Sequence, residues 1–204
     1  MSGTYAFRKE LSQHKDGLLR IVIISLLGGA SGAWLLLQTP EAVFRDAIPW
    51  LLLFATVLFI FGRQINTLLK NITKKHQHAS AIGAVFLTVL LLAVSAYGGF
   101  FNAGLGIVVL SYLAFAGFTN INTMNGLKLL ISSTISLIAI VLFIYNDVIA
   151  WYQGVIVLCG TLAGGYVAAD LSRKLPQKYV KRFVILASIA TTVYFFYDIY
   201  LSPR

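Results

Sequence analysis

The sequence predicts an all-α, polytopic membrane protein with about seven transmembrane segments, an inverted-repeat relation and one Gly-rich broken segment. Composition is the first observation: of 204 residues, 58% are hydrophobic and only 11% are charged, whereas a soluble domain has about 25% charged residues. The second observation is that the apolar residues form runs of about the 17–25 residues that cross a bilayer. The third is a glycine-rich stretch inside one of these runs.

The apolar runs number seven, and short polar segments separate them. They are Leu18–Leu37, Ala47–Gly62, Ser80–Tyr97, Gly99–Phe118, Leu127–Tyr145, Val148–Leu171 and Tyr179–Leu201. The second run is short unless its helix continues through Arg63, whose long side chain can reach the lipid headgroups. The fourth run contains most of the glycine-rich stretch, so we do not expect it to form a single straight helix.

Lys and Arg residues predict the orientation of the chain. They cluster in the N-terminal segment, in the loop after the second run and in the loop after the sixth, while the alternate loops hold only Arg45 and Arg204. By the positive-inside rule the basic loops are cytoplasmic. We therefore expect an inner-membrane protein whose N-terminus is cytoplasmic and whose C-terminus is periplasmic or extracellular. The same distribution accounts for the net charge of +9 without nucleic-acid binding.

Two parts of the chain resemble each other at a constant offset. Gly28-Gly29 corresponds to Gly164-Gly165, and Pro40 corresponds to Pro176, each pair being 136 positions apart. The two copies are predicted to cross the membrane in opposite directions, which is typical of inverted-repeat transporters. The alternative is that these glycines only allow close helix packing. On the repeat interpretation, residues 1–79 are a partial first repeat of two spans with the basic loop, and residues 80–204 are a complete second repeat of about five spans.

The glycine-rich stretch carries the functional interpretation. Residues 97–107 read Tyr-Gly-Gly-Phe-Phe-Asn-Ala-Gly-Leu-Gly-Ile. Glycine loosens a helix, and backbone groups freed inside a membrane need partners in protein or in a wet cavity. Broken segments of this kind bind the cargo of transport proteins. If the helix resumes after Gly104 and Gly106, its free N–H groups and positive dipole end suit an oxyanion.

The residues from Tyr97 to Ile107 also resemble a signature of the sulfite exporter TauE/SafE family, as do Asn125-Gly-Leu-Lys128 and the stretch from Gly164 to Pro176. The resemblance is close for the second half of the family pattern, and the N-terminal part of that pattern is missing. It implies a permease for small sulfur-containing oxyanions or sulfonates. Asn102 departs from the family pattern, which usually has glycine there.

We expect the substrate-binding residues to lie in two neighbouring groups. They are Gly98, Gly99, Asn102, Gly104 and Gly106 in the broken segment, and Asn122, Asn125 and Lys128 at the start of the next span. An intramembrane charge such as Lys128 is a functional candidate by default. The alternatives are a close helix crossing without a ligand, helix capping by Asn120 or Asn122, and a Lys128 side chain that reaches the headgroups.

Other classes of protein fit the sequence less well. Ser31 lies in a Gly-x-Ser-Gly sequence, but an intramembrane serine nucleophile needs a neighbouring histidine, and the three histidines fall in predicted loops. We therefore expect no enzyme activity, no cofactor and no metal. The expected partners are a small anion, the lipid bilayer and a coupling proton or cation; a homo-oligomer is compatible with the sequence. The rival hypothesis is a truncated, non-transporting membrane subunit or scaffold.

Overall fold

The computed structural model describes residues 15–73, 81–118, 120–174 and 177–201, and all of its regular structure is helical. The helices follow in the order α3 (Lys15–Gln38), α4 (Glu41–Thr73), α5 (Ala81–Phe100), α6 (Leu105–Phe115), α7 (Ile121–Tyr145), α8 (Trp151–Lys174) and α9 (Gln177–Phe196), and a short π-helical turn, η1 (Tyr197–Leu201), continues α9. The histidines singled out in the sequence, His14, His76 and His78, lie outside the described residues.

Four of these helices are long and apolar enough to cross a membrane. They are α3 from Gly17 to Gln38, α5 from Gly83 to Phe100, α7 from Ile121 to Tyr145, and α9 with η1 from Arg182 to Leu201. The other predicted spans correspond to α4, α6 and α8, of which α6 has only 11 residues and is too short to cross a bilayer alone. The predicted all-helical, polytopic fold is confirmed. The second predicted span is longer than expected, because α4 continues without interruption past Arg63 to Thr73.

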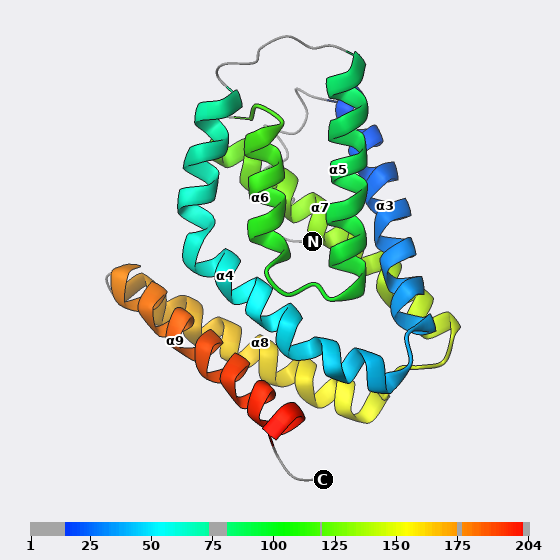
Figure 1. Ribbon diagram of the computed structural model, residues 1–204, viewed down its shortest axis with the longest axis vertical. Coiled ribbons are helices and arrows are strands. Elements are labelled where there is room, and N and C mark those ends of the chain that lie inside the picture. The colour runs from blue at the N-terminus through cyan, green and yellow to red at the C-terminus, as the bar shows by residue number, and fades with distance from the viewer. Residues whose placement is uncertain (1–14, 74–80, 119, 175–176, 202–204) are drawn as a thin grey trace.

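The helices form a bundle that a second group of helices crosses at one end (Figure 1). In the bundle, α3 packs against α5 and α7, and α6 packs against α4, α5 and α7. The first part of α4 turns across the end of the bundle and packs against α9. The buried core lies between α5, α6 and α7; it includes Leu91, Val94, Leu105, Val109, Leu113, Met124, Leu127, Ile131 and Ile135.

Glycines allow α3 to approach α5 and α7 closely. A Cβ added at Gly32 would lie 1.9 Å from the carbonyl oxygen of Ala96, and one added at Gly99 would lie 2.1 Å from that of Gly29. A Cβ added at Gly28 would lie 2.6 Å from the Cβ of Ser95. Small residues at such positions let helix backbones touch, which is how membrane helices gain packing energy in the absence of a hydrophobic driving force.

The contact between α4 and α9 is antiparallel and joins residues at the repeat offset. The hydroxyls of Thr56 and Thr192 lie 3.1 Å apart, both side chains are buried, and the two residues are 136 positions apart. Trp50 packs against Phe196 and donates a hydrogen bond to the Tyr200 hydroxyl. The contact therefore joins two residues of one type at the spacing of the glycine and proline pairs noted in the sequence.

Candidate functional site

The glycine-rich segment is broken, as the sequence predicted. Helix α5 ends at Phe100, the chain turns through residues 101–104, and α6 begins at Leu105. Asn102 and Gly104 have φ angles of 63° and 71°, a left-handed conformation that glycine adopts freely and asparagine tolerates better than most residues. The helix resumes two residues earlier than expected, because the left-handed Gly104 is already its N-cap.

The loop between α5 and α6 is held in place from two sides. The Tyr97 hydroxyl donates a hydrogen bond to the carbonyl oxygen of Ala103, and the N–H of Phe101 donates to the Tyr97 carbonyl oxygen. The Tyr97 ring packs edge to face against Phe54 of α4, with ring centroids 5.5 Å apart. A Cβ added at Gly104 would lie 3.4 Å from Ala55 of the same helix. The loop thus has a defined conformation between α4 and its own helix α5.

The contact that Asn102 makes with α7 shows where the break lies along that candidate membrane span. Its side-chain amide donates a hydrogen bond of 3.4 Å to the Ser136 hydroxyl of α7. Ser136 is nine residues before the end of α7 at Tyr145, which is about 13 Å along a helix. The left-handed loop therefore lies beside the interior of a candidate span and away from its end.

Lys128 lies beside the first turn of α6. A Cβ added at Gly106 would be 3.6 Å from Lys128 Cδ, within ordinary contact distance, and Lys128 is partly buried. The dipole of a helix makes its first turn positive. In α6 the N–H groups of Leu105 and Ile107 donate to the carbonyl oxygens of Asn102 and Gly104, and the N–H of Gly106 lies between them. A lysine side chain beside such a helix start adds positive charge to it. This arrangement is chemically suited to an anion.

The asparagines at the start of α7 have different positions. Asn120 is the N-cap of α7, because its side-chain oxygen accepts hydrogen bonds from the N–H groups of Asn122 and Thr123. The sequence left open whether Asn120 or Asn122 has this role. Asn122 is exposed in the first turn, and Asn125 is partly buried one turn before Lys128. The capping interaction accounts for Asn120, and it leaves the side chains of Asn122 and Asn125 for other contacts.

Gly98 and Gly99 lie apart from Lys128 and the start of α6. A Cβ added at Gly98 would be 2.8 Å from the Leu105 side chain, and Gly99 faces the backbone of α3. Both glycines are buried, and close packing explains why no side chain is present at either position. The structure thus places Asn102 against Ser136 of α7 and Gly106 beside Lys128. Gly104 instead faces α4, and Gly98 and Gly99 face the Leu105 side chain and α3.

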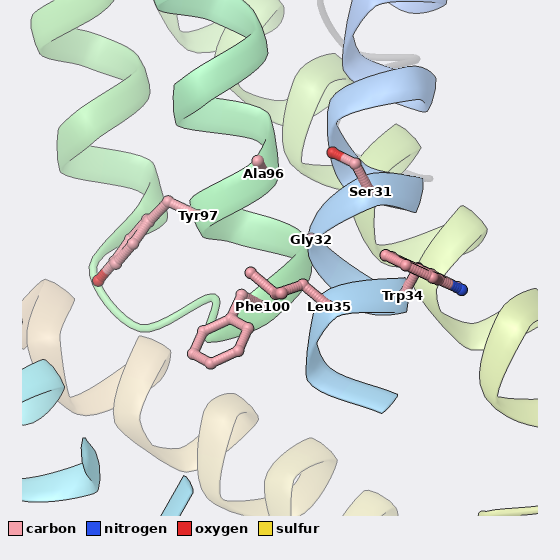
Figure 2. Close-up of a pocket in the computed structure, with 7 residues that line it drawn as sticks. All are labelled: Ser31, Gly32, Trp34, Leu35, Ala96, Tyr97 and Phe100. Carbon is pink, nitrogen blue, oxygen red and sulfur yellow. The ribbon is translucent and has the colours of Figure 1, made fainter. Parts of the chain in front are cut away.

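A hollow of about 420 Å³ lies between the ends of α3 and α5 (Figure 2). It is lined by Ser31, Gly32, Trp34, Leu35, Ala96, Tyr97 and Phe100. In Figure 2 the side chains of Leu35 and Phe100 lie close to each other, between α3 and α5. The Ser31 hydroxyl donates to the Gly28 carbonyl oxygen within its own helix. This open, largely apolar hollow contains none of the predicted substrate-binding residues.

Sequence inspection missed several residues that shape the break. Ser136 is the partner of Asn102, and Phe54 and Ala55 support the loop from α4. Nothing in the sequence around these three residues marks them. The pair Thr56 and Thr192 did carry a signal, because the same residue type occurs at the repeat offset. Among the described residues, no group of three or more His, Cys, Asp and Glu side chains is placed to hold a metal ion.

Comparisons with known proteins relate the chain to a family of membrane proteins. The chain matches the sulfite exporter TauE/SafE family over residues 1–195. It is 24% identical over 195 residues to a "probable membrane transporter protein" of Haemophilus influenzae, a match that covers 95% of this chain and 73% of that protein. It is 25% identical over 194 residues to the "probable membrane transporter protein ORF9" of a Sinorhizobium species, covering 94% and 71%. No solved structure matches the chain.

The family match spans nearly the whole chain, including the broken segment and helices α3, α7 and α8. The resemblance inferred from the motifs is therefore confirmed. The chain is a multi-pass membrane protein and belongs to the sulfite exporter TauE/SafE family of transporters.

Proposed function

We propose that this protein is a secondary transporter for small anions, of the class of sulfur-containing oxyanions or sulfonates. The observation that carries the proposal is the start of α6 inside the membrane, with Lys128 beside its first turn. An anion bound there receives hydrogen bonds from the Gly106 N–H and from the amide of Asn102, and Lys128 neutralises its charge. Asn122 and Asn125 line the route from the cytoplasmic end of α7 to this site.

The family name supports transport of such anions, and the names of the two relatives support membrane transport. The chain has no element for ATP-driven transport, such as a Gly-x-x-x-x-Gly-Lys loop, so a gradient of a proton or another cation supplies the energy. In this proposal the protein is not an enzyme. Its N-terminus is cytoplasmic, and its C-terminus lies on the opposite side of the inner membrane.

The repeat gives the transporter its mechanical basis. We infer that residues 80–204 form one repeat and residues 1–79 part of a second, related by a two-fold axis that passes between Thr56 and Thr192. A two-fold axis brings equivalent residues of the two repeats into contact with each other, on segments that run antiparallel. Alternating access in inverted-repeat transporters comes from one repeat moving against the other, and α4 connects this contact directly to the loop through Ala55 and Phe54.

A flux assay tests the proposal. The purified chain is reconstituted into vesicles, and uptake of radiolabelled sulfite or thiosulfate is measured with and without an imposed proton or sodium gradient. We expect uptake above that of protein-free vesicles, and saturation with substrate. If correctly inserted protein gives no uptake of sulfite, thiosulfate or a small sulfonate under any gradient, the chain is a non-transporting subunit or scaffold and the proposal is wrong.

A further inference from the structure

Helix α8 has an apolar surface with no partner in the described structure. Every residue from Trp151 to Ala168 is exposed, including Val155, Ile156 and Leu162. A Cβ added at Gly154, Gly160, Gly164 or Gly165 would meet nothing within 4 Å. In Figure 1, α8 is drawn at the end of the bundle that the first part of α4 crosses.

The counterpart of α8 shows what such a surface binds. At the 136-residue offset, Gly164 and Gly165 correspond to Gly28 and Gly29 of α3. Gly28 approaches α5 at Ser95, and Gly29 approaches α7 at Ile135 and Ile138. Gly164 and Gly165 thus lie at positions of α8 whose equivalents in α3 bring that helix into backbone contact with α5 and α7. We propose that the Gly164–Gly165 face of α8 docks a pair of membrane helices equivalent to α5 and α7, supplied by a further polypeptide segment.

The length of the relatives supports this occupant. A match of 195 residues that is 73% of the Haemophilus influenzae protein implies about 267 residues in that protein, of which about 72 lie outside the match. The stretch from α5 to α7, Ala81 to Tyr145, has 65 residues. The relative therefore has enough additional chain for one more set of these helices.

A second copy of this chain is a poorer occupant. Its own α3 already covers the surfaces of α5 and α7 that α8 would need. An inverted repeat also requires the docked pair to run opposite to α5 and α7, and the Lys and Arg distribution predicts one orientation for every copy. A simple glycine-mediated pairing of two α8 helices would use Gly160 and Gly164 equally, since they have the four-residue spacing of such dimers.

The glycines of α8 offer matched variants that separate these possibilities. Gly154 and Gly160 correspond to Leu18 and Ile24 in α3, which pack against the core with large side chains. We therefore expect the helix pair to bind α8 when Gly154→Leu or Gly160→Ile is present. Gly164→Leu and Gly165→Leu should prevent its binding, because a large side chain would occupy the contact. Because nothing lies within 4 Å of any of the four positions, all four variants of the isolated chain should retain its thermal stability in detergent, and this is measured first.

The test uses the full chain, affinity-tagged, and the longest stretch of the Haemophilus influenzae relative that lies outside the match, epitope-tagged. Both are expressed in one bacterial membrane, extracted in mild detergent and purified through the tag on the chain. We expect the two polypeptides in a near-equal molar ratio. Gly164→Leu and Gly165→Leu should lower the captured amount about tenfold or more, the effect of a typical overpacking cost, and Gly154→Leu and Gly160→Ile should not.

Two results overturn the proposal. One is the absence of the probe from the purified wild-type chain although both polypeptides are in the membrane. The other is equal loss with Gly160→Ile and Gly164→Leu together with disulfide-linked dimers through Cys159, the exposed cysteine on α8, which would identify the face as a self-association surface. No readout depends on anion flux, so failure of the transport proposal leaves this inference standing.

Discussion

The Thr56 hydroxyl donates its hydrogen bond to the hydroxyl of Thr192, its counterpart 136 positions later in the chain. The direction follows because the single hydroxyl hydrogen of Thr192 already goes to the carbonyl oxygen of Ser188, 2.7 Å away. Both threonines are buried where α4 crosses α9. The contact is polar in an apolar surrounding, and it joins the two parts of the proposed repeat.

This asymmetry predicts different costs for two similar substitutions. Thr56→Val removes one hydrogen bond and should lower the free energy of unfolding in detergent by about 0.5–1 kcal/mol. Thr192→Val leaves the buried Thr56 donor without its partner and should cost about 1–2 kcal/mol. Denaturation of the two single variants and the double variant gives the coupling energy, expected near 0.6 kcal/mol. Strictly additive effects would show that the hydroxyls do not interact.

Close packing of α3 on α5 makes a second prediction. Gly32→Ala would place a Cβ 1.9 Å from the Ala96 carbonyl oxygen, so the helices must separate, and overpacking of this kind costs about 1–3 kcal/mol. Gly154→Ala is the matched control, because it puts the same methyl group into open space on another helix. Thermal melting in detergent compares the two. Equal melting temperatures would mean that α3 and α5 do not approach as described.

Lys128 is expected to be essential for transport and dispensable for folding. Lys128→Met keeps the length of the side chain that passes Gly106 and removes its charge, so an anion at the start of α6 loses its counter-charge. Uptake of sulfite or thiosulfate should fall by at least about 100-fold, comparable to the loss of a desolvated charge–anion contact of about 3 kcal/mol. Lys128→Arg should retain part of the uptake.

The amount of Lys128→Met protein in the membrane and its melting temperature are the controls for this experiment. Both should equal those of the wild-type protein. Undiminished uptake by the Met variant would remove Lys128 from the site and would favour a side chain that only reaches the headgroups.

Two neighbouring asparagines should separate stability from transport. Asn120→Ala removes the N-cap of α7 and should lower the free energy of unfolding by about 1 kcal/mol. Asn122→Ala changes an exposed side chain in the same turn, so stability should stay within about 0.5 kcal/mol while anion uptake decreases. Melting curves and flux measurements on the same preparations check both expectations. Normal uptake by Asn122→Ala would exclude Asn122 from the route of the anion.

The sequence by itself determined the helical membrane fold and the break in the glycine-rich segment, and it is the source of the proposed repeat. These features depend on local physical chemistry: long apolar runs have no stable alternative to helices in lipid, and consecutive glycines at Tyr97–Ile107 weaken a helix wherever it lies. The family resemblance followed from the same residues, because the motifs are contiguous in the chain. The exact helix ends could not be predicted from the sequence. Helix α6 begins at Leu105 because the left-handed Gly104 is its N-cap.

Only the tertiary structure decided which glycines serve packing and which lie at the break. Gly98 and Gly104 belong to the same glycine-rich stretch, but Gly98 faces the Leu105 side chain and Gly104 faces Ala55 of α4. It also decided that Asn102 meets Ser136, 34 positions later, and that α8 remains uncovered while its counterpart α3 is packed. Contacts between distant residues depend on how the helices cross, and apolar periodicity along one helix does not specify which partner covers it.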